Sequence, residues 1–106
     1  MDIDAYAANA YATAAPPKDR EHALTIAALG LTGEAGELAD ALKKHIAQGH
    51  ELDIPKLIDE AGDILWYLAY FAVAAETTLS EIATRNLEKL RKRYGDRFNP
   101  ERSIHR

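Results

Sequence analysis

The sequence has 106 residues, with 13 lysines and arginines against 17 aspartates and glutamates and a formal net charge of −4. This acidic balance excludes the broad basic surface that duplex nucleic acid or an anionic membrane would require. The absence of cysteine excludes disulfides, thiolate metal sites and cysteine nucleophiles.

The length predicts a single domain. A chain of this size buries a modest core, so we expect one domain over residues 1–106 that gains stability from a partner. The N-terminus is acidic, and no apolar run approaches about 18 residues. We therefore expect a soluble, cytoplasmic protein that binds neither nucleic acid nor a membrane.

Four helices are predicted in chain order, because strand-like alternation is absent and turn residues divide the chain. They cover residues 3–14, 19–48, 55–75 and 79–94. The last begins with the capping-box pattern of Thr78 and Glu81 and ends at Gly95. Short connections favour antiparallel neighbours. The expected fold is all-α, an antiparallel four-helix bundle completed by oligomerisation.

The third helix has apolar residues on all sides. Trp66, Tyr70 and Val73 lie away from the stripe that contains Ala61 and Leu65. A helix without a polar face is buried on both sides. We expect its second side to contact another subunit. The alternative is that the short N-terminal helix covers it.

Acidic residues lie just off the apolar stripes of the second and third helices. Glu34 and Glu37 lie about 60° and 120° from Leu31, and Glu60 and Asp63 share one flank of the third helix. Two helices packed side by side can bring these four carboxylates to one pocket. Gathered carboxylates repel one another, and Mg²⁺, with Mn²⁺ as a substitute, suits an oxygen-rich site.

Glycines accompany both acid pairs, in GEAGELAD (residues 33–40) and DEAGDILW (residues 59–66). Glycine inside a helix costs about 1 kcal/mol relative to alanine. We therefore predict that the missing side chains make room for a metal and a bulky ligand. A single acid pair is typical of a solvated helix face, so this prediction depends on the repetition.

The fourth helix carries a possible phosphate-binding group. Asn86, Lys89 and Arg93 lie within about 60° of one another. Ammonium and guanidinium groups neutralise phosphate oxygens, and an amide orients them. The alternative is that these cations are surface charges paired with Glu88 or Asp96.

Three stretches together resemble the MazG family of all-α nucleoside triphosphate pyrophosphohydrolases. They are GLTGEAGELADALKK (residues 30–44), DEAGDILWYLA (residues 59–69) and NLEKLRKRYGDRF (residues 86–98). The resemblance implies a homodimer or homotetramer that hydrolyses a (deoxy)nucleoside triphosphate to the monophosphate and pyrophosphate, with Mg²⁺ as cofactor.

The same resemblance implies roles for individual residues. It makes four acids the catalytic, Mg²⁺-binding group: Glu34, Glu37, Glu60 and Asp63. It makes three residues of the fourth helix contacts to phosphate or sugar: Asn86, Lys89 and Arg93. Many relatives carry a further glutamate where this chain has Gly33, so the number of metal ions and the acid that activates water stay open.

Other functions compete with this one. A di-iron carboxylate bundle needs Glu-x-x-His pairs, and no histidine follows a glutamate by three residues. A catalytically silent helical interaction protein and a phosphoribosyl-ATP pyrophosphohydrolase remain alternatives. Nothing in the aromatic residues selects a base. Lys43 and Lys44 are further candidates for phosphate contact, and His22 and His45 have no assigned role.

Overall fold

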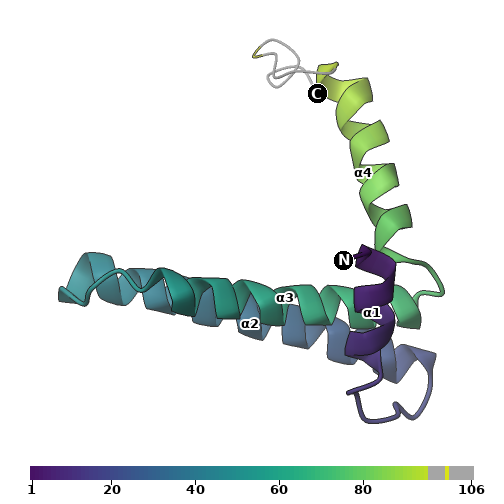
Figure 1. Ribbon diagram of the computed structural model, residues 1–106, viewed down its shortest axis with the longest axis horizontal. Helices are drawn as coiled ribbons and strands as arrows, with labels where there is room; N and C mark the ends of the chain where they lie inside the picture. The colour runs from purple at the N-terminus through teal and green to yellow at the C-terminus, as the bar shows by residue number, and fades with distance from the viewer. Residues whose placement is uncertain (96–99, 101–106) are drawn as a thin grey trace.

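The computed structural model describes residues 1–95 and 100, and the described part contains four helices and no strand (Figure 1). The helices are α1 (Ile3–Tyr11), α2 (Arg20–Gln48), α3 (Ile54–Ala74) and α4 (Leu79–Tyr94). The prediction of an all-α fold is confirmed. The largest difference from the predicted bounds is at α1, which ends at Tyr11 rather than at residue 14.

Each helix begins at a side chain that accepts backbone N–H groups of the first turn. These caps are Asp2, Asp19, Asp53 and Thr78. The predicted cap of α4 is confirmed, since the amide of Glu81 donates to Thr78 Oγ1 at 3.1 Å. Helix α2 ends at Gly49, whose φ of 72° lies in the left-handed region that favours glycine.

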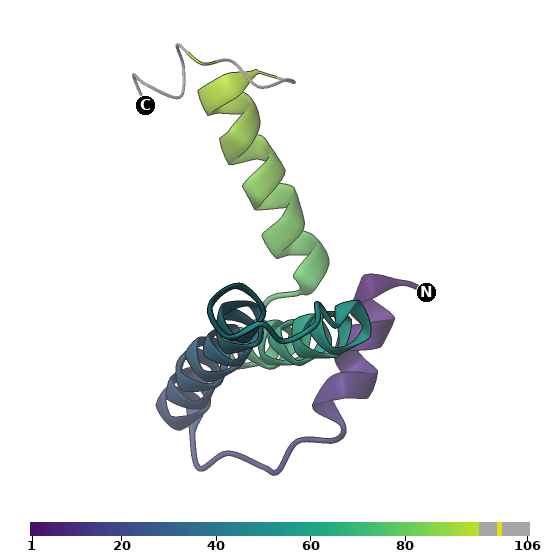
Figure 2. The same cartoon turned by 90° about the vertical axis from the view of Figure 1, so that its left-hand side faces the viewer.

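Helices α2 and α3 form a long antiparallel hairpin, in which they lie side by side (Figures 1 and 2). At the end near α1, Ala23 and Ala27 of α2 are buried together with Tyr70 of α3. Alanines here let the large tyrosine ring fit between the two helix backbones. This contact sets how the two helices face each other at this end of the hairpin.

Helix α1 crosses the C-terminal end of α3 and covers the side on which another subunit was expected. Trp66 Nε1 donates to Thr13 Oγ1 at 3.0 Å, and the Tyr11 and Tyr70 rings are 5.7 Å apart. Tyr70 is only 3% exposed. The expectation that Trp66 and Tyr70 face another subunit was therefore wrong, and the alternative, cover by the N-terminal helix, is correct. Only Val73 of that group is exposed.

Helix α4 leaves the hairpin at a steep angle instead of packing back along α3 (Figure 1). Its first turn is anchored to α1, because the amide and hydroxyl of Ser80 both donate to the carboxylate of Asp4. Leu79 is buried at this junction, but Leu87 and Leu90 further along are exposed. Within the described residues α4 makes no contact with α2. One chain therefore does not close a four-helix bundle.

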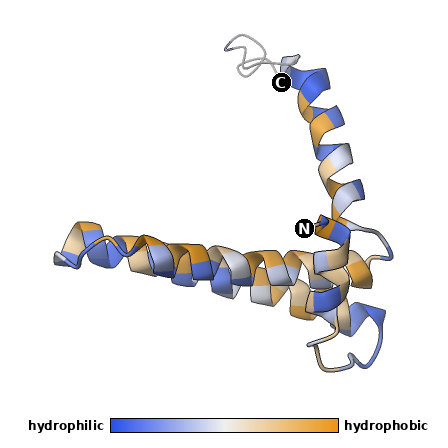
Figure 3. Ribbon diagram, in the orientation of Figure 1, coloured by the Kyte–Doolittle hydropathy of each residue, from blue (hydrophilic) through white to orange (hydrophobic). Residues whose placement is uncertain are grey.

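Large apolar side chains of α2 and α3 are uncovered in the single chain. Ile46 of α2 is 82% exposed and Ile58 of α3 is 64% exposed, and apolar residues recur along the hairpin in Figure 3. The radius of gyration is 16.8 Å, whereas a compact domain of 100 residues has about 13 Å. Helix α2 contacts α3 with the small-residue flank of its stripe rather than with its centre.

The described residues include no helix that is both long enough and apolar enough to cross a membrane.

Candidate functional site

The hairpin brings acids of both helices together. Glu34 and Glu37 of α2 and Glu60 of α3 each offer a carboxylate oxygen within 4.8 Å of the others. Asp63 is not part of this tightest group, but its negative charge raises the pKa of both Glu34 and Glu60. All four predicted acids therefore belong to one electrostatic cluster, which we call the acid cluster.

The register of the hairpin produces this convergence. The Tyr67 ring of α3 lies against Gly30 of α2. One helical turn beyond Gly30 is Glu34, and one turn back from Tyr67 is Asp63. A further three residues in each direction lead to Glu37 and Glu60. Because antiparallel helices run in opposite directions at the same rise per residue, these positions stay opposite one another.

Two carboxylate oxygens of the acid cluster lack hydrogen-bond donors. Glu34 Oε2 and Glu60 Oε2 are buried and have no hydrogen-bond partner in the described part of the chain. Burial raises the pKa of Glu34, and the charges of Glu37, Asp63 and Glu60 raise it further. Burial also raises the pKa of Glu60, and the charge of Glu37 raises it further. Together they outweigh the charge of Lys56, which lowers this pKa. Buried acceptors without donors are costly, and a cation relieves them.

These residues fit a hard divalent cation. Mg²⁺ and Mn²⁺ prefer carboxylate oxygens, and the two partnerless oxygens come from opposite sides of the hairpin, one from Glu34 and one from Glu60. No histidine or cysteine belongs to the group formed by the described residues. The donor set therefore matches the predicted class of metal.

The glycines of the two motifs differ in their surroundings. A Cβ built at Gly33, Gly36 or Gly62 would have no neighbouring atom within 4 Å among the described residues. A Cβ at Gly30 would overlap the ring of Tyr67. The open space beside the first three is compatible with the predicted room for a ligand, which stays a prediction, and only Gly30 is explained by a contact within the chain.

The predicted phosphate-binding residues do not reach the acid cluster within one chain. Lys89 and Arg93 line a surface hollow of about 580 Å³ on α4, and α4 does not contact α2 in the described part. Asn86 is exposed on the same helix. Their role stays a prediction. The alternative pairing with Asp96 falls outside the described residues.

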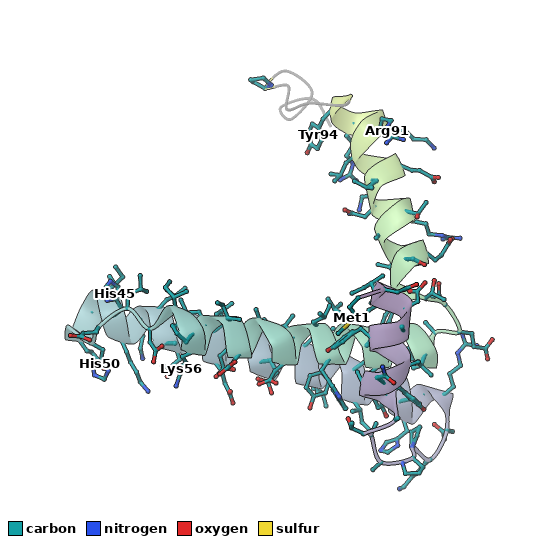
Figure 4. The ribbon with its side chains drawn as sticks, in the orientation of Figure 1. Met1, His45, His50, Lys56, Arg91 and Tyr94 are labelled. Atoms are coloured by element: carbon teal, nitrogen blue, oxygen red, sulfur yellow. The ribbon has the colours of Figure 1, made fainter. Side chains whose placement is uncertain are left out.

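Two lysines and a histidine lie beside the acid cluster. A pocket of about 720 Å³ has Glu37 and Glu60 in its lining and also contains Lys44, Lys56 and His50. Figure 4 shows Lys56 and His50 projecting from the same side near the tip of the hairpin. Lys44 was predicted from the sequence as a candidate for phosphate contact, and Lys56 was not. The sequence did contain a signal for Lys56, since Lys56 precedes Glu60 by four residues and so lies on the same helix face.

Known proteins support the resemblance noted from the motifs. Residues 22–98 match the family described as MazG nucleotide pyrophosphohydrolase domain. The chain is similar to the "Gene 37 protein" of Mycobacterium phage L5, with 36% identity over 104 residues that cover 88% of this chain and 89% of the phage protein. No solved structure matches the chain.

The family match includes the acid cluster and all of α3. It begins at residue 22, near the start of α2, and extends beyond the end of α4 at Tyr94. Enzymes of this family generally depend on a divalent cation, in agreement with the chemistry of the acid cluster. On the strength of this match, the chain belongs to the MazG nucleotide pyrophosphohydrolase family.

Proposed function

We propose that this protein hydrolyses a (deoxy)nucleoside triphosphate to the monophosphate and pyrophosphate, with Mg²⁺ held by the four acids of the cluster, Glu34, Glu37, Glu60 and Asp63. The observation that carries the proposal is the pair of buried, partnerless oxygens of Glu34 and Glu60, two acids of neighbouring helices whose carboxylates converge. Mn²⁺ offers the same preference for oxygen ligands and is expected to substitute.

The acids have two tasks in this reaction. When bound, Mg²⁺ supplies charge neutralisation of phosphate oxygens and lowers the pKa of water. A carboxylate of the cluster accepts a proton from the attacking water, whose oxygen bonds to the α-phosphorus while the α–β phosphoanhydride bond breaks. Pyrophosphate leaves with the electron pair of that bond. Water is the nucleophile, so no covalent enzyme intermediate is required.

The proposal includes a homo-oligomer, a dimer or a tetramer. The uncovered apolar residues of α2 and α3, among them Ile46 and Ile58, support it, because soluble monomers rarely leave such residues uncovered in large groups. A second chain can also supply what α4 does not bring to the acid cluster of its own chain. We therefore assign the substrate contacts of Asn86, Lys89 and Arg93 to the cluster of another subunit.

The remaining parts of the proposal follow from the substrate. Nucleoside triphosphates are abundant in the cytoplasm, so we propose a cytoplasmic enzyme that acts as one domain over residues 1–106. Its direct partners are the nucleotide and further copies of the chain. Neither nucleic acid nor a membrane is part of the proposed reaction.

The test is to neutralise single acids without changing their volume. Glu37→Gln and Asp63→Asn are each expected to abolish divalent-metal-dependent release of pyrophosphate while leaving the helical circular dichroism spectrum intact. Asp59→Asn is the matched control, since Asp59 directly precedes Glu60 in the motif, but Asp63 and not Asp59 is among the charges that raise the pKa of Glu34 and Glu60. All eight common ribo- and deoxyribonucleoside triphosphates serve as substrates, with phosphoribosyl-ATP as a ninth.

Near-normal activity of either variant would contradict the proposed site. A silent helical interaction protein is distinguished by a Mg²⁺ titration of the wild type. We expect the melting temperature to rise, because the cation relieves the repulsion between the acids. A melting temperature indifferent to Mg²⁺, together with no hydrolysis of any of the nine substrates, would favour the silent protein.

A further inference from the structure

Gly30 is the one glycine of α2 whose missing side chain is filled by another residue in the described structure. A Cβ built there would overlap the Cδ1, Cε1 and Cζ atoms of the Tyr67 ring. The backbone of Gly30 has no positive φ, so its conformation is open to any residue. Alanine would favour the helix more. The contact with Tyr67 is therefore the physical reason for a glycine at this position.

The Tyr67 ring cannot easily move away from Gly30. Trp66 packs against it edge-on, with ring centroids 4.9 Å apart and an interplanar angle of 81°. Trp66 is itself fixed by its hydrogen bond to Thr13 of the segment after α1 and by stacking on Tyr70 at 5.7 Å. A methyl group at residue 30 would therefore displace α2 rather than the ring.

Such a displacement would act directly on the acid cluster. Gly30 precedes Glu34 by one helical turn, and Tyr67 follows Asp63 by one turn. The ring thus sets the separation of the two helices at the layer next to the acids. Mg²⁺ demands near-ideal octahedral geometry with oxygens at about 2.0–2.1 Å, so a change in helix separation is poorly tolerated.

We infer that Gly30 is a positioning residue for the metal site: its bare backbone seats the Tyr67 ring, and this seat holds the acids of α2 and α3 at the distance that a divalent cation requires. The inference rests on the proposed function, because it assumes that the acid cluster binds the metal. It assigns the ring of Tyr67, rather than its hydroxyl, the role of a spacer between the helices.

The experiment measures Mg²⁺ affinity by calorimetry in the absence of nucleotide, together with thermal unfolding. Gly30→Ala is expected to weaken Mg²⁺ binding by about 10- to 100-fold, as changes to residues that orient metal ligands do. Leu29→Ala is the control on the same helix, because Leu29 directly precedes Gly30 but is 69% exposed. It should leave Mg²⁺ affinity unchanged.

Variants of Tyr67 separate positioning from a general loss of stability. Tyr67→Phe keeps the ring and should bind Mg²⁺ like the wild type, whereas Tyr67→Ala removes the spacer and should weaken binding severalfold. In the double variant, Gly30→Ala should add less than about twofold to the effect of Tyr67→Ala, since the clash no longer exists. If Gly30→Ala alone does not fold, the comparison of Tyr67→Ala with Tyr67→Phe still decides the spacer role.

Two results would overturn the inference. In the first, Gly30→Ala and Tyr67→Ala both bind Mg²⁺ with the affinity of the wild type. In the second, Gly30→Ala weakens Mg²⁺ binding equally whether or not the Tyr67 ring is present. Hydrolysis assays on the same samples keep the two proposals apart. An active wild type together with unchanged Mg²⁺ binding in both Gly30→Ala and Tyr67→Ala would refute only this inference. If Gly30→Ala and Tyr67→Ala both weaken Mg²⁺ binding but the wild type hydrolyses no nucleotide, only the proposed reaction would be refuted.

Discussion

Two adjacent lysines of α2 allow a sharp test of where the phosphate chain binds. Lys43 and Lys44 both pair with Asp40, at 3.3 and 3.1 Å. Only Lys44 also lines the pocket that includes Glu37 and Glu60. Two helical turns separate Lys44 from Glu37, which is about 10 Å along the axis. A lysine side chain spans roughly half that distance, so its ammonium group can reach the terminal phosphates of a nucleotide bound at the acids.

We predict that Lys44→Met raises KM for the nucleotide and that Lys43→Met does not. A hydrogen bond to a charged group contributes about 1.5–3 kcal/mol. The side chain of Lys44 is 47% exposed and already shares its charge with Asp40, so solvent and the existing ion pair reduce the expected loss to about 1 kcal/mol. This corresponds to roughly a fivefold increase in KM.

Steady-state kinetics of pyrophosphate release at saturating Mg²⁺ provides the measurement. Loss confined to KM indicates uniform binding of ground and transition states, while an equal loss in kcat indicates that Lys44 acts mainly as pyrophosphate departs. Equal kinetics of the two methionine variants would refute the reasoning, because the two lysines differ mainly in their access to the pocket.

Three further predictions concern charge and assembly. Burial and neighbouring carboxylates raise the pKa of Glu34 and Glu60, so the stability of the metal-free protein should fall as pH rises from the ordinary glutamate range through these raised values. The increase in melting temperature caused by Mg²⁺ should therefore be larger at about pH 8 than at about pH 5. An equal increase at both pH values would contradict this prediction. Ile58→Glu should reduce the oligomer to a chain of 11.7 kDa in light scattering, and persistence of the wild-type mass would contradict an interface at this residue. Arg93→Ala should lower kcat/KM by about tenfold or more with unchanged Mg²⁺ affinity, and unchanged kinetics would return Arg93 to the solvated surface.

Much of the helical framework was predictable because its signals are local. The capping residues Asp19, Asp53 and Thr78 each act within three residues of their own position. The acid pairs were predictable for the same reason, since residues three apart share a helix face. Their convergence needed only one long-range assumption, that α2 and α3 pack side by side, and the hairpin confirms it.

The parts that sequence reasoning missed depend on contacts between distant residues. The stripe centred on Leu31 was expected to face the core, but α2 approaches α3 through its flank at Ala27 and Gly30. Small residues allow that closer approach, and hydrophobic periodicity alone does not rank them above leucine. The cover of Trp66 by α1 depends on a hydrogen bond to Thr13, 53 residues away in the chain. No local pattern carries such information.

The small core explains why the metal and a second chain matter together. Among the described residues no large side chain is fully buried, and most buried positions are alanines such as Ala27 and Ala69. Each alanine removes little apolar surface from water, so one chain gains limited hydrophobic stabilisation. The acid cluster opposes it further, because its buried oxygens lack donors. A divalent cation would reverse that cost at the acid cluster, and a second copy would cover apolar residues that the single chain leaves exposed. Since both events stabilise the same pair of helices, each favours the other by mass action, and loss of the cation should also weaken assembly.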